Sequence, residues 1–513
     1  MRRSIEREVR AASLVRRPDA AWAFALRAGL AVAVPLVLLV AVGRPSSAGV
    51  ATFGAFTALY ARDEPYRRRA RVMAAAGAGL IACVGIGTLA GGHEVTAVAA
   101  VAAVGGVATL LCGRFRVGPP GGLMFAFAAA VTAAIPAPDL GRNIGLVAAA
   151  AALAWLISMS GVLVDRDAPM RLAVSRALRA SAALVDSPDG PPGIQARYQA
   201  ALAVEKAWRA VPPDRHAEAL LVAHAETELS GLHGHDPEAA AQLRRLAGAA
   251  ARRGPAPVPP ADGGEDAEVL GRRLATLLLS EPATRRPGPL WPAAARVAAG
   301  ALAAGAAAGA LVHGTGLGHP YWAAVSAVAV LQADSLRLSL QKAMQRAAGT
   351  TIGLFLAGAA VALPGDQWTL VVAIVIAQVA AELLVVRNYG LAMLAITPLA
   401  LLVGELGHPT PPAALIGDRL VQTLLGCGLG LAAAALVRNR AAARHLDGAI
   451  NEVAAATAEL RRGHGEARRL AGLLLQLREA YAVASGEPGL APDATERVLR
   501  AERAARLALV GRH

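Results

Sequence analysis

Apolar residues fall into two groups of long segments, separated by a polar region between Asp165 and Pro289. Many segments approach the roughly 20 residues that an α-helix needs to cross about 30 Å of hydrocarbon. The first group covers residues 23–42, 47–60, 72–91, 95–111, 121–135 and 143–164. The second covers residues 292–312, 321–333, 347–363, 368–386, 391–403 and 415–437. This pattern predicts an integral membrane protein with about a dozen helical spans.

The second, fifth, eighth and eleventh segments are the weakest of the twelve. We expect discontinuous or re-entrant helices there, because irregular backbone is tolerated at membrane depth where protein or water covers it. Between the two groups, apolar residues recur at helical spacing in a polar background, and a Pro/Gly-rich linker follows at 254–264. The chain therefore divides into an N-terminal segment (1–22), a first membrane repeat (23–164), a helical insert with its linker (165–290), a second membrane repeat (291–437) and a helical tail (438–513).

Composition and charge support the membrane interpretation. Hydrophobic residues make up 55% of the chain, and the net charge is +14. The arginines cluster in short segments between apolar blocks rather than along one stripe, which argues against nucleic-acid binding. Since Lys and Arg near span ends stay in the cytoplasm, both termini, the insert and the tail are predicted to be cytoplasmic. The preference for Arg over Lys suggests a bacterial source, and thus the bacterial plasma membrane.

The two groups of segments are related in sequence. Arg17-Pro18, Trp22 and Arg27 recur with identical spacing as Arg286-Pro287, Trp291 and Arg296, and Pro45 and Arg71 are separated as Pro320 and Arg346 are. Each half holds an even number of predicted spans, so both halves begin on the same side of the membrane. The predicted fold class is an all-α membrane protein with two parallel six-helix repeats, and a pathway is expected between the halves.

The second half carries three motifs of a known family: Tyr321-Trp322 before a span, Arg346-x-x-Gly349-Thr350-x-x-Gly353 opening the next, and Arg419 near the start of the last. These resemble the fusaric acid resistance and aromatic acid exporter family. The resemblance implies export of aromatic carboxylic acids or related anions, driven by the proton gradient, with plant anion channels as distant relatives. The first half lacks the Gly-Thr and Tyr-Trp pairs, so two equivalent sites are not expected.

Arginines inside spans are the leading candidates for anion binding, because a buried charge persists mainly where it meets a water-filled cavity or a partner. We expect Arg346 to be the strongest, since Gly349 and Thr350 place it at the first turn of a predicted helix, where free N–H groups attract anions. Trp322 is a candidate for substrate stacking. The other candidates for substrate binding are Arg27, Arg296 and Arg419. The alternatives are that the arginines reach out to lipid phosphates and that Tyr321 and Trp322 are interfacial belt residues.

Proton coupling would require an acid in the membrane, and Glu382 is the candidate carrier, with Gln378 one turn away. Pairing of Glu382 with Arg387 is the alternative. Asp418 is the second candidate for proton coupling, and it is also expected to partner Arg419. We find no nucleotide-binding loop or hydrolase motif, so no enzyme activity and no cofactor are expected. His233, His235 and Asp236 were considered as metal ligands and rejected, because they lie in a polar loop.

The leading hypothesis is a secondary exporter of organic, and in particular aromatic, anions. An anion channel without proton coupling is one alternative. A membrane scaffold that transports nothing and binds a cytoplasmic partner through its insert and tail is the other. The expected partners are membrane lipids and a small organic anion, with any homo-oligomer forming through the membrane or the cytoplasmic helices.

Overall fold

The computed structural model divides the chain into two compact units. The membrane unit contains residues 1–62, 67–161 and 289–439, and the polar unit contains residues 63–66, 162–288 and 440–513. The structure describes residues 12–13, 22–134, 139–187, 191–212, 214–230, 236–259, 291–315, 320–333, 335–362, 366–406, 412–437, 440–487, 490–491 and 493–510. All regular structure in these ranges is helical, in agreement with the predicted all-α class.

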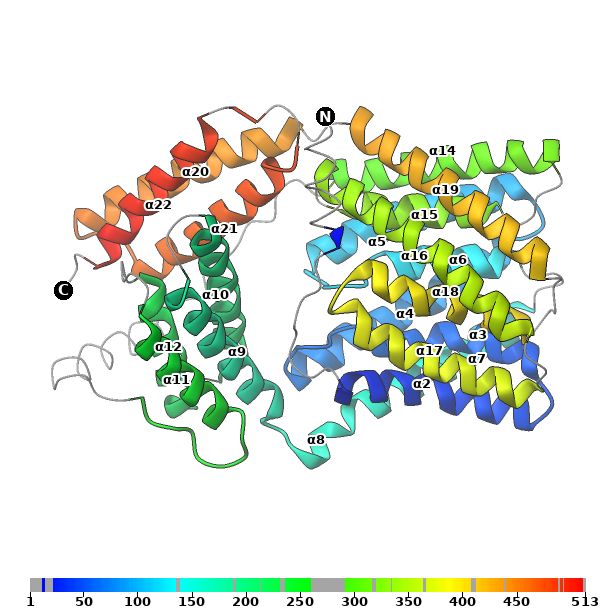
Figure 1. Ribbon diagram of the computed structural model, residues 1–513, viewed down its shortest axis with the longest axis horizontal. Helices are drawn as coiled ribbons and strands as arrows, with labels where there is room; N and C mark the ends of the chain where they lie inside the picture. Colours follow the sequence, from blue (N-terminus) through cyan, green and yellow to red (C-terminus); the bar gives the residue numbers. More distant parts are fainter. Residues whose placement is uncertain are drawn as a thin grey trace. The chain divides into compact units, whose positions relative to one another are not determined.

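Each of the twelve apolar segments forms a helix (Figure 1). In the first half these are α2 (Trp22–Ala41), α3 (Pro45–Ala55) followed by the 3₁₀ turn η1 (Phe56–Leu59), α4 (Tyr66–Ala90), α5 (Glu94–Arg114), α6 (Leu123–Ala133) and α7 (Leu140–Met159). In the second half they are α14 (Trp291–Thr315), α15 (Tyr321–Leu331), α16 (Leu336–Ala362), α17 (Gln367–Val385), α18 (Tyr389–Glu405) and α19 (Pro412–Leu436).

Helix length distinguishes full spans from half-spans. Seven of the described helices are long and apolar enough to cross a membrane. By contrast, α3, α6 and α15 have 11 residues each, which at 1.5 Å per residue reach only about half of the hydrocarbon layer. Three of the four segments that the sequence marked as weak are therefore short helices. The fourth, α18, has 17 residues and contains Pro398.

Large apolar side chains cover the outside of the membrane unit. Leu26 and Leu38 on α2 are each 59% exposed, and Phe355 on α16 is 68% exposed. In water such a surface would be unfavourable, whereas hydrocarbon accepts it without cost. Together with the seven spanning helices, these exposed side chains establish a multi-pass membrane protein.

Corresponding helices of the two halves pack in corresponding ways. Contacts of α2, α3 and α7 with one another are matched by contacts of α14, α15 and α19. Between the halves, α5 packs on α14 as α17 packs on α2, and α6 contacts α15 as α18 contacts α3. Such reciprocal pairing is what a two-fold relation between two parallel repeats would produce, and it supports the repeat predicted from the sequence.

The polar unit contains two helical bundles. The first is formed by α9 (Ala168–Val185), α10 (Pro191–Ala210), α11 (His216–Ser230) and α12 (Pro237–Ala250), which follow the short α8 (Gly161–Val164). The second is formed by α20 (Arg440–Arg461), α21 (Ala467–Ala484) and α22 (Ala494–Val510). Each bundle has its own apolar core. In the second, the buried Arg478 forms an ion pair with the buried Glu502.

Candidate anion site

Three arginines are buried in the second half of the membrane unit. Arg296, Arg346 and Arg419 are 4%, 4% and 3% exposed. None of them lies on the lipid-facing surface, so the alternative in which these side chains reach lipid phosphates does not describe them. Removing a guanidinium from water costs several kcal/mol unless other groups compensate its charge. The partners of each arginine therefore decide what the site can do.

Arg346 lies in the middle of α16 and contacts two neighbouring helices. Its Nε donates to Ser326 Oγ on α15 (3.2 Å), and its Nη1 donates to Tyr389 Oη on α18 (2.9 Å). Because Nη1 also lies 4.0 Å from Met393 Sδ on α18, three side chains from two helices hold the guanidinium. Both of its oxygen partners are neutral hydroxyls, which orient the positive charge without cancelling it.

The prediction that Arg346, Gly349 and Thr350 open a helix was wrong. Helix α16 begins at Leu336, so Gly349 and Thr350 lie well inside it and their N–H groups bond within the helix. The sequence misled because apolarity begins near Ala347, whereas the helix continues into the basic segment before it. Gly349 instead permits close packing: a Cβ there would lie 2.5 Å from Gly390 O and 2.6 Å from Met393 Cβ.

Arg419 on α19 lies over an aromatic ring. Its Cζ is 3.0 Å from the centroid of the Trp322 ring, a cation–π contact. Its Nε and Nη1 are buried and have no hydrogen-bond partner among the described residues. The expected ion pair with Asp418 is not among the ion pairs of the described chain, because neighbouring residues on a helix point in directions about 100° apart.

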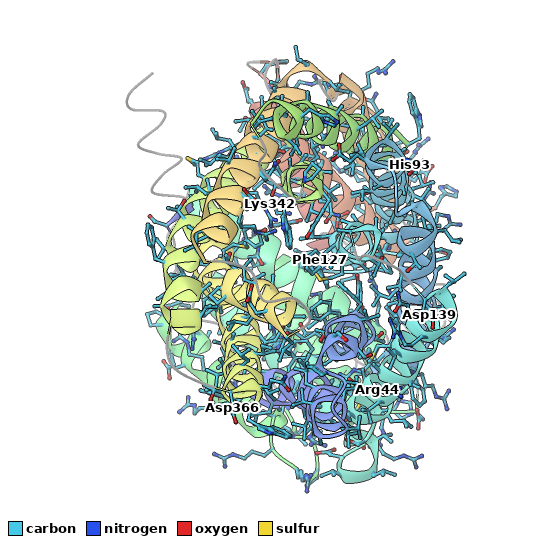
Figure 2. The ribbon with its side chains drawn as sticks, turned by 90° about the vertical axis from the view of Figure 1, so that its right-hand side faces the viewer. Arg44, His93, Phe127, Asp139, Lys342 and Asp366 are labelled. Atoms are coloured by element: carbon cyan, nitrogen blue, oxygen red, sulfur yellow. The ribbon has the colours of Figure 1, made fainter. Side chains whose placement is uncertain are left out.

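Trp322 is buried, with 7% of its surface exposed, and so does not belong to an interfacial belt. Its ring also contacts Tyr321 and, across the two halves, Phe127 on α6, with centroids 5.0 Å and 5.4 Å away. Figure 2 labels Phe127 near the centre of the membrane unit, with helices around it. Since Arg419 already covers Trp322, this tryptophan positions the arginine instead of offering that face to a substrate.

The two cations face the same helix one turn apart. Trp322, under Arg419, and Ser326, bonded to Arg346, are separated by four residues on α15, so they share a face about 6 Å apart. The charges of Arg346 and Arg419 are close enough to repel each other, and Tyr389 lies near both. No carboxylate in the described part of the chain pairs with either guanidinium.

A repeated pattern surrounds the two arginines, and our sequence reasoning missed it. Arg346, Thr350 and Gly353 on α16 have the same spacing as Arg419, Thr423 and Gly426 on α19. Both threonines are 1% exposed, and their Oγ1 atoms have no hydrogen-bond partner among the described residues. Each arginine thus has a buried hydroxyl one turn away. Comparing the two spans for a shared Arg-x₃-Thr-x₂-Gly spacing could have revealed it.

The remaining predicted arginines lie elsewhere. Arg296 donates from Nη2 to Ala333 O (2.9 Å), just beyond the end of α15, so part of its guanidinium caps that helix. Arg27, its counterpart in the first half, is only partly buried and donates from Nε to Ala23 O in its own helix (3.0 Å). Arg296 is thus buried and contacts the end of another helix, whereas Arg27 is partly exposed and bonds within its own helix.

Glu382 is buried on α17, at 9% exposure. Its Oε1 accepts a hydrogen bond from Gln378 Nε2 (3.1 Å), and the positive charge that acts on it is that of Arg62 rather than Arg387. No hydrogen bond or ion pair between described residues joins Glu382 to Arg346 or Arg419. Among the described residues no cluster could hold a metal; His233 and His235 lie outside them.

Comparison with known proteins relates part of this chain to a family. Residues 303–433 match the sequence model described as fusaric acid resistance protein-like. The chain is also 24% identical over 515 residues to the uncharacterized membrane protein YvaC of Bacillus subtilis (strain 168), covering 91% of this chain and 81% of that protein. This part of the chain, residues 303–433, is therefore similar to the fusaric acid resistance-like family. No solved structure matches it.

The family match bears directly on the site. Arg346, Arg419 and Trp322 lie inside the matched region, while Arg27 and Arg296 lie outside it. Fusaric acid resistance-like proteins form a family of membrane transporters rather than of enzymes, which agrees with the buried, uncompensated cations found here. The predicted resemblance to this family is therefore found again by the comparison, and the family suggests a role in membrane transport.

Proposed function

We propose that this protein is a secondary transporter that exports organic anions across the bacterial plasma membrane. The proposal rests on one observation: Arg346 and Arg419 are buried beside each other without a carboxylate partner in the described chain. An anion that entered between them would supply the missing negative charge and accept hydrogen bonds from Arg419 Nε and Nη1. Binding of the anion would then compensate the buried positive charges, and this compensation would provide affinity for the anion.

In this proposal Tyr389 and Ser326 orient Arg346, and Trp322 orients Arg419. Thr350 and Thr423 add hydroxyl donors within one helical turn of each arginine. The positive charges at the polar ends of the spans keep both termini, the insert and the tail in the cytoplasm. Arg296 caps the end of α15 and Gly349 permits close packing, so neither is proposed to contact the anion directly.

Flux in proteoliposomes tests the proposal. We expect wild-type protein to carry labelled benzoate and Arg346→Gln to lose roughly tenfold or more of that flux, because a charge-assisted hydrogen bond contributes about 1.5–3 kcal/mol. The matched control is Arg71→Gln, the same change at the repeat-related position, where the arginine is exposed. Equal flux through wild type and Arg346→Gln, both monodisperse, would remove Arg346 from the pathway.

Proton coupling is a further part of the proposal, with Glu382 as the carrier. The buried carboxylate hydrogen-bonded to Gln378 supports it, and the lack of a described contact between Glu382 and the two arginines favours the second candidate, an anion channel without coupling. An imposed pH gradient distinguishes the two. Coupled export requires that the gradient drive benzoate accumulation and that Glu382→Gln abolish it. Flux that ignores the gradient supports the channel.

A further inference from the structure

The second half of the membrane unit contains two cationic positions of the same construction, not one. Arg346 and Arg419 each have a buried threonine four residues later and a packing glycine seven residues later. The glycines allow neighbouring helices to approach closely. A Cβ on Gly353 would lie 2.8 Å from Thr397 Cβ on α18, and a Cβ on Gly426 would lie 2.8 Å from Ser326 Cβ on α15. Helix α16 therefore packs closely on α18 at Gly353, and α19 packs closely on α15 at Gly426.

The separation between the two positions is set by α15. Arg419 lies on Trp322 and Arg346 bonds to Ser326, one turn along the same helix. The side chains that hold the two guanidiniums are thus one helical turn apart on α15, and the charge of Arg346 acts on Arg419. A monoanion could neutralise one of them and would leave the other buried and uncompensated.

Resting on the proposed function, we infer that the site takes an organic dianion whose two carboxylates lie about one helical turn apart. One carboxylate is held by Arg346 with the Thr350 hydroxyl, and the other by Arg419 with the Thr423 hydroxyl. The face of Trp322 is already covered by Arg419, so recognition depends on the placement of charge rather than on stacking of a ring. A second negative charge is what distinguishes this cargo class from simple aromatic monocarboxylates.

The test compares ligands of one shape and different charge. Isophthalate carries two carboxylates on a benzene ring, and 3-carbamoylbenzoate is nearly isosteric with one charge fewer. Binding to the purified full-length protein is measured by titration calorimetry, and flux of both is measured in proteoliposomes. We expect isophthalate to bind roughly tenfold to hundredfold more tightly, because its second carboxylate gains a charge-assisted contact.

Two variants and a control locate the effect. Arg346→Gln and Arg419→Gln should each bring the affinity for isophthalate close to that for 3-carbamoylbenzoate, because the second carboxylate then has no guanidinium to contact. Arg71→Gln should keep the wild-type ratio. Arg346→Lys and Arg419→Lys, which keep the charge but lose the planar fork, should restore part of the preference.

Equal affinities for isophthalate and 3-carbamoylbenzoate, with both carried across the membrane, would overturn the dianion inference and leave the proposed function standing. Sulfate binding as tightly as isophthalate would overturn it too, since one compact ion cannot span two positions a helical turn apart. Flux of neither organic anion through folded protein would overturn the proposed function, and the inference with it.

Discussion

The two halves of the membrane unit share their packing but differ in their centres. In the first half, the rings of Phe53, Phe56 and Phe127 contact one another with centroids 5.4 to 6.4 Å apart. In the second half, the buried cations Arg346 and Arg419 occupy the interior. Arg71 has the position of Arg346 in the predicted repeat, yet it is exposed and its Nε donates to Arg67 O in its own helix.

This difference separates the scaffold from the site. Reciprocal helix pairing requires small residues where backbones approach, and both halves retain them. A buried arginine of the first half, Arg69, donates to the backbone carbonyls of Ala61 and Arg62. An apolar aromatic cluster of this half touches Trp322 through Phe127. We therefore regard the first half as the support against which the second half holds its arginines. The predictions below test this division of roles.

The largest effect is expected for glycines at the close approaches of both halves. A Cβ on Gly54 would collide with Val147 O and lie 2.8 Å from Ala150 Cβ, and one on Gly426 would collide with Ala323 O. Because backbone atoms block both positions, Gly54→Ala and Gly426→Ala should each destabilise the protein by about 3 kcal/mol. Thermal unfolding of the full-length protein in detergent measures the loss.

Gly145 on α7 and Gly428 on α19 are the matched controls, because no atom lies within 4 Å of a Cβ at either position. Alanine there should be neutral or stabilise by up to about 1 kcal/mol, since it favours a helix more than glycine does. A large loss at Gly426 with none at Gly54 would break the comparison, because the two halves would then not share one mode of packing.

The next effect concerns the arginines themselves. Isophthalate at a hundred times the wild-type dissociation constant should stabilise wild type and Arg71→Gln by about 2.7 kcal/mol, and should stabilise Arg346→Gln by only about 0.4–1.4 kcal/mol. In the absence of the anion, Arg346→Gln should be as stable as wild type or more so, because it removes an uncompensated buried charge. Thermal shifts with and without isophthalate provide the measurement. An unchanged shift in Arg346→Gln would place the anion elsewhere.

A smaller effect is expected at Trp322. Trp322→Leu removes the ring beneath Arg419 and should weaken anion binding by about 1–2 kcal/mol, whereas Trp322→Phe keeps a ring and should lose less. Phe127→Leu is the control from the other half, since it alters the same aromatic contact without touching Arg419. If Phe127→Leu weakened binding as much as Trp322→Leu, the first half would be part of the site rather than its support.

Hydropathy predicted where the helices lie but not where they begin. The apolar pattern located twelve helices and marked α3, α6 and α15 as weak, and these are the short ones. It could not show that α16 starts at Leu336, because Arg337, Lys342 and Arg346 interrupt the apolar pattern while remaining compatible with a helix. The helix-terminus argument for Gly349 and Thr350 failed for that reason.

The candidate site was predicted only in part. Burial of Arg346 and Arg419 follows from charge inside an apolar span, which the sequence displays. The residues that contact these arginines could not be predicted from the sequence, because the contacts of Arg419 with Trp322 and of Arg346 with Tyr389 join helices far apart along the chain. Spacing along a helix predicts neighbours one turn away, such as Gln378 and Glu382, and has no information on which helices meet.

The smallest effect extends the comparison to the polar unit, where arginines are matched by acids. Asp165, just before α9, accepts hydrogen bonds from Arg171 Nη1 (3.1 Å) and Arg253 Nε (3.0 Å). The hydrogen bond from Arg171 is the main cause that lowers the pKa of Asp165 from 3.8 to about 2. Since the ion pair is near the surface, Asp165→Asn should destabilise this unit by less than about 1 kcal/mol at neutral pH.

The pH dependence of that loss follows from the direction of the shift. The folded state holds the proton of Asp165 less tightly than the unfolded state, so the stabilisation is complete well above pH 3.8 and disappears as the pH falls through about 2. Pepsin cleavage within α9 of the full-length protein should therefore be faster in Asp165→Asn than in wild type near pH 5, and equal in the two near pH 2. If Asp165→Asn were still cleaved faster than wild type near pH 2, packing rather than charge would hold this segment. The contrast with the uncompensated arginines of the membrane unit would then have no electrostatic basis.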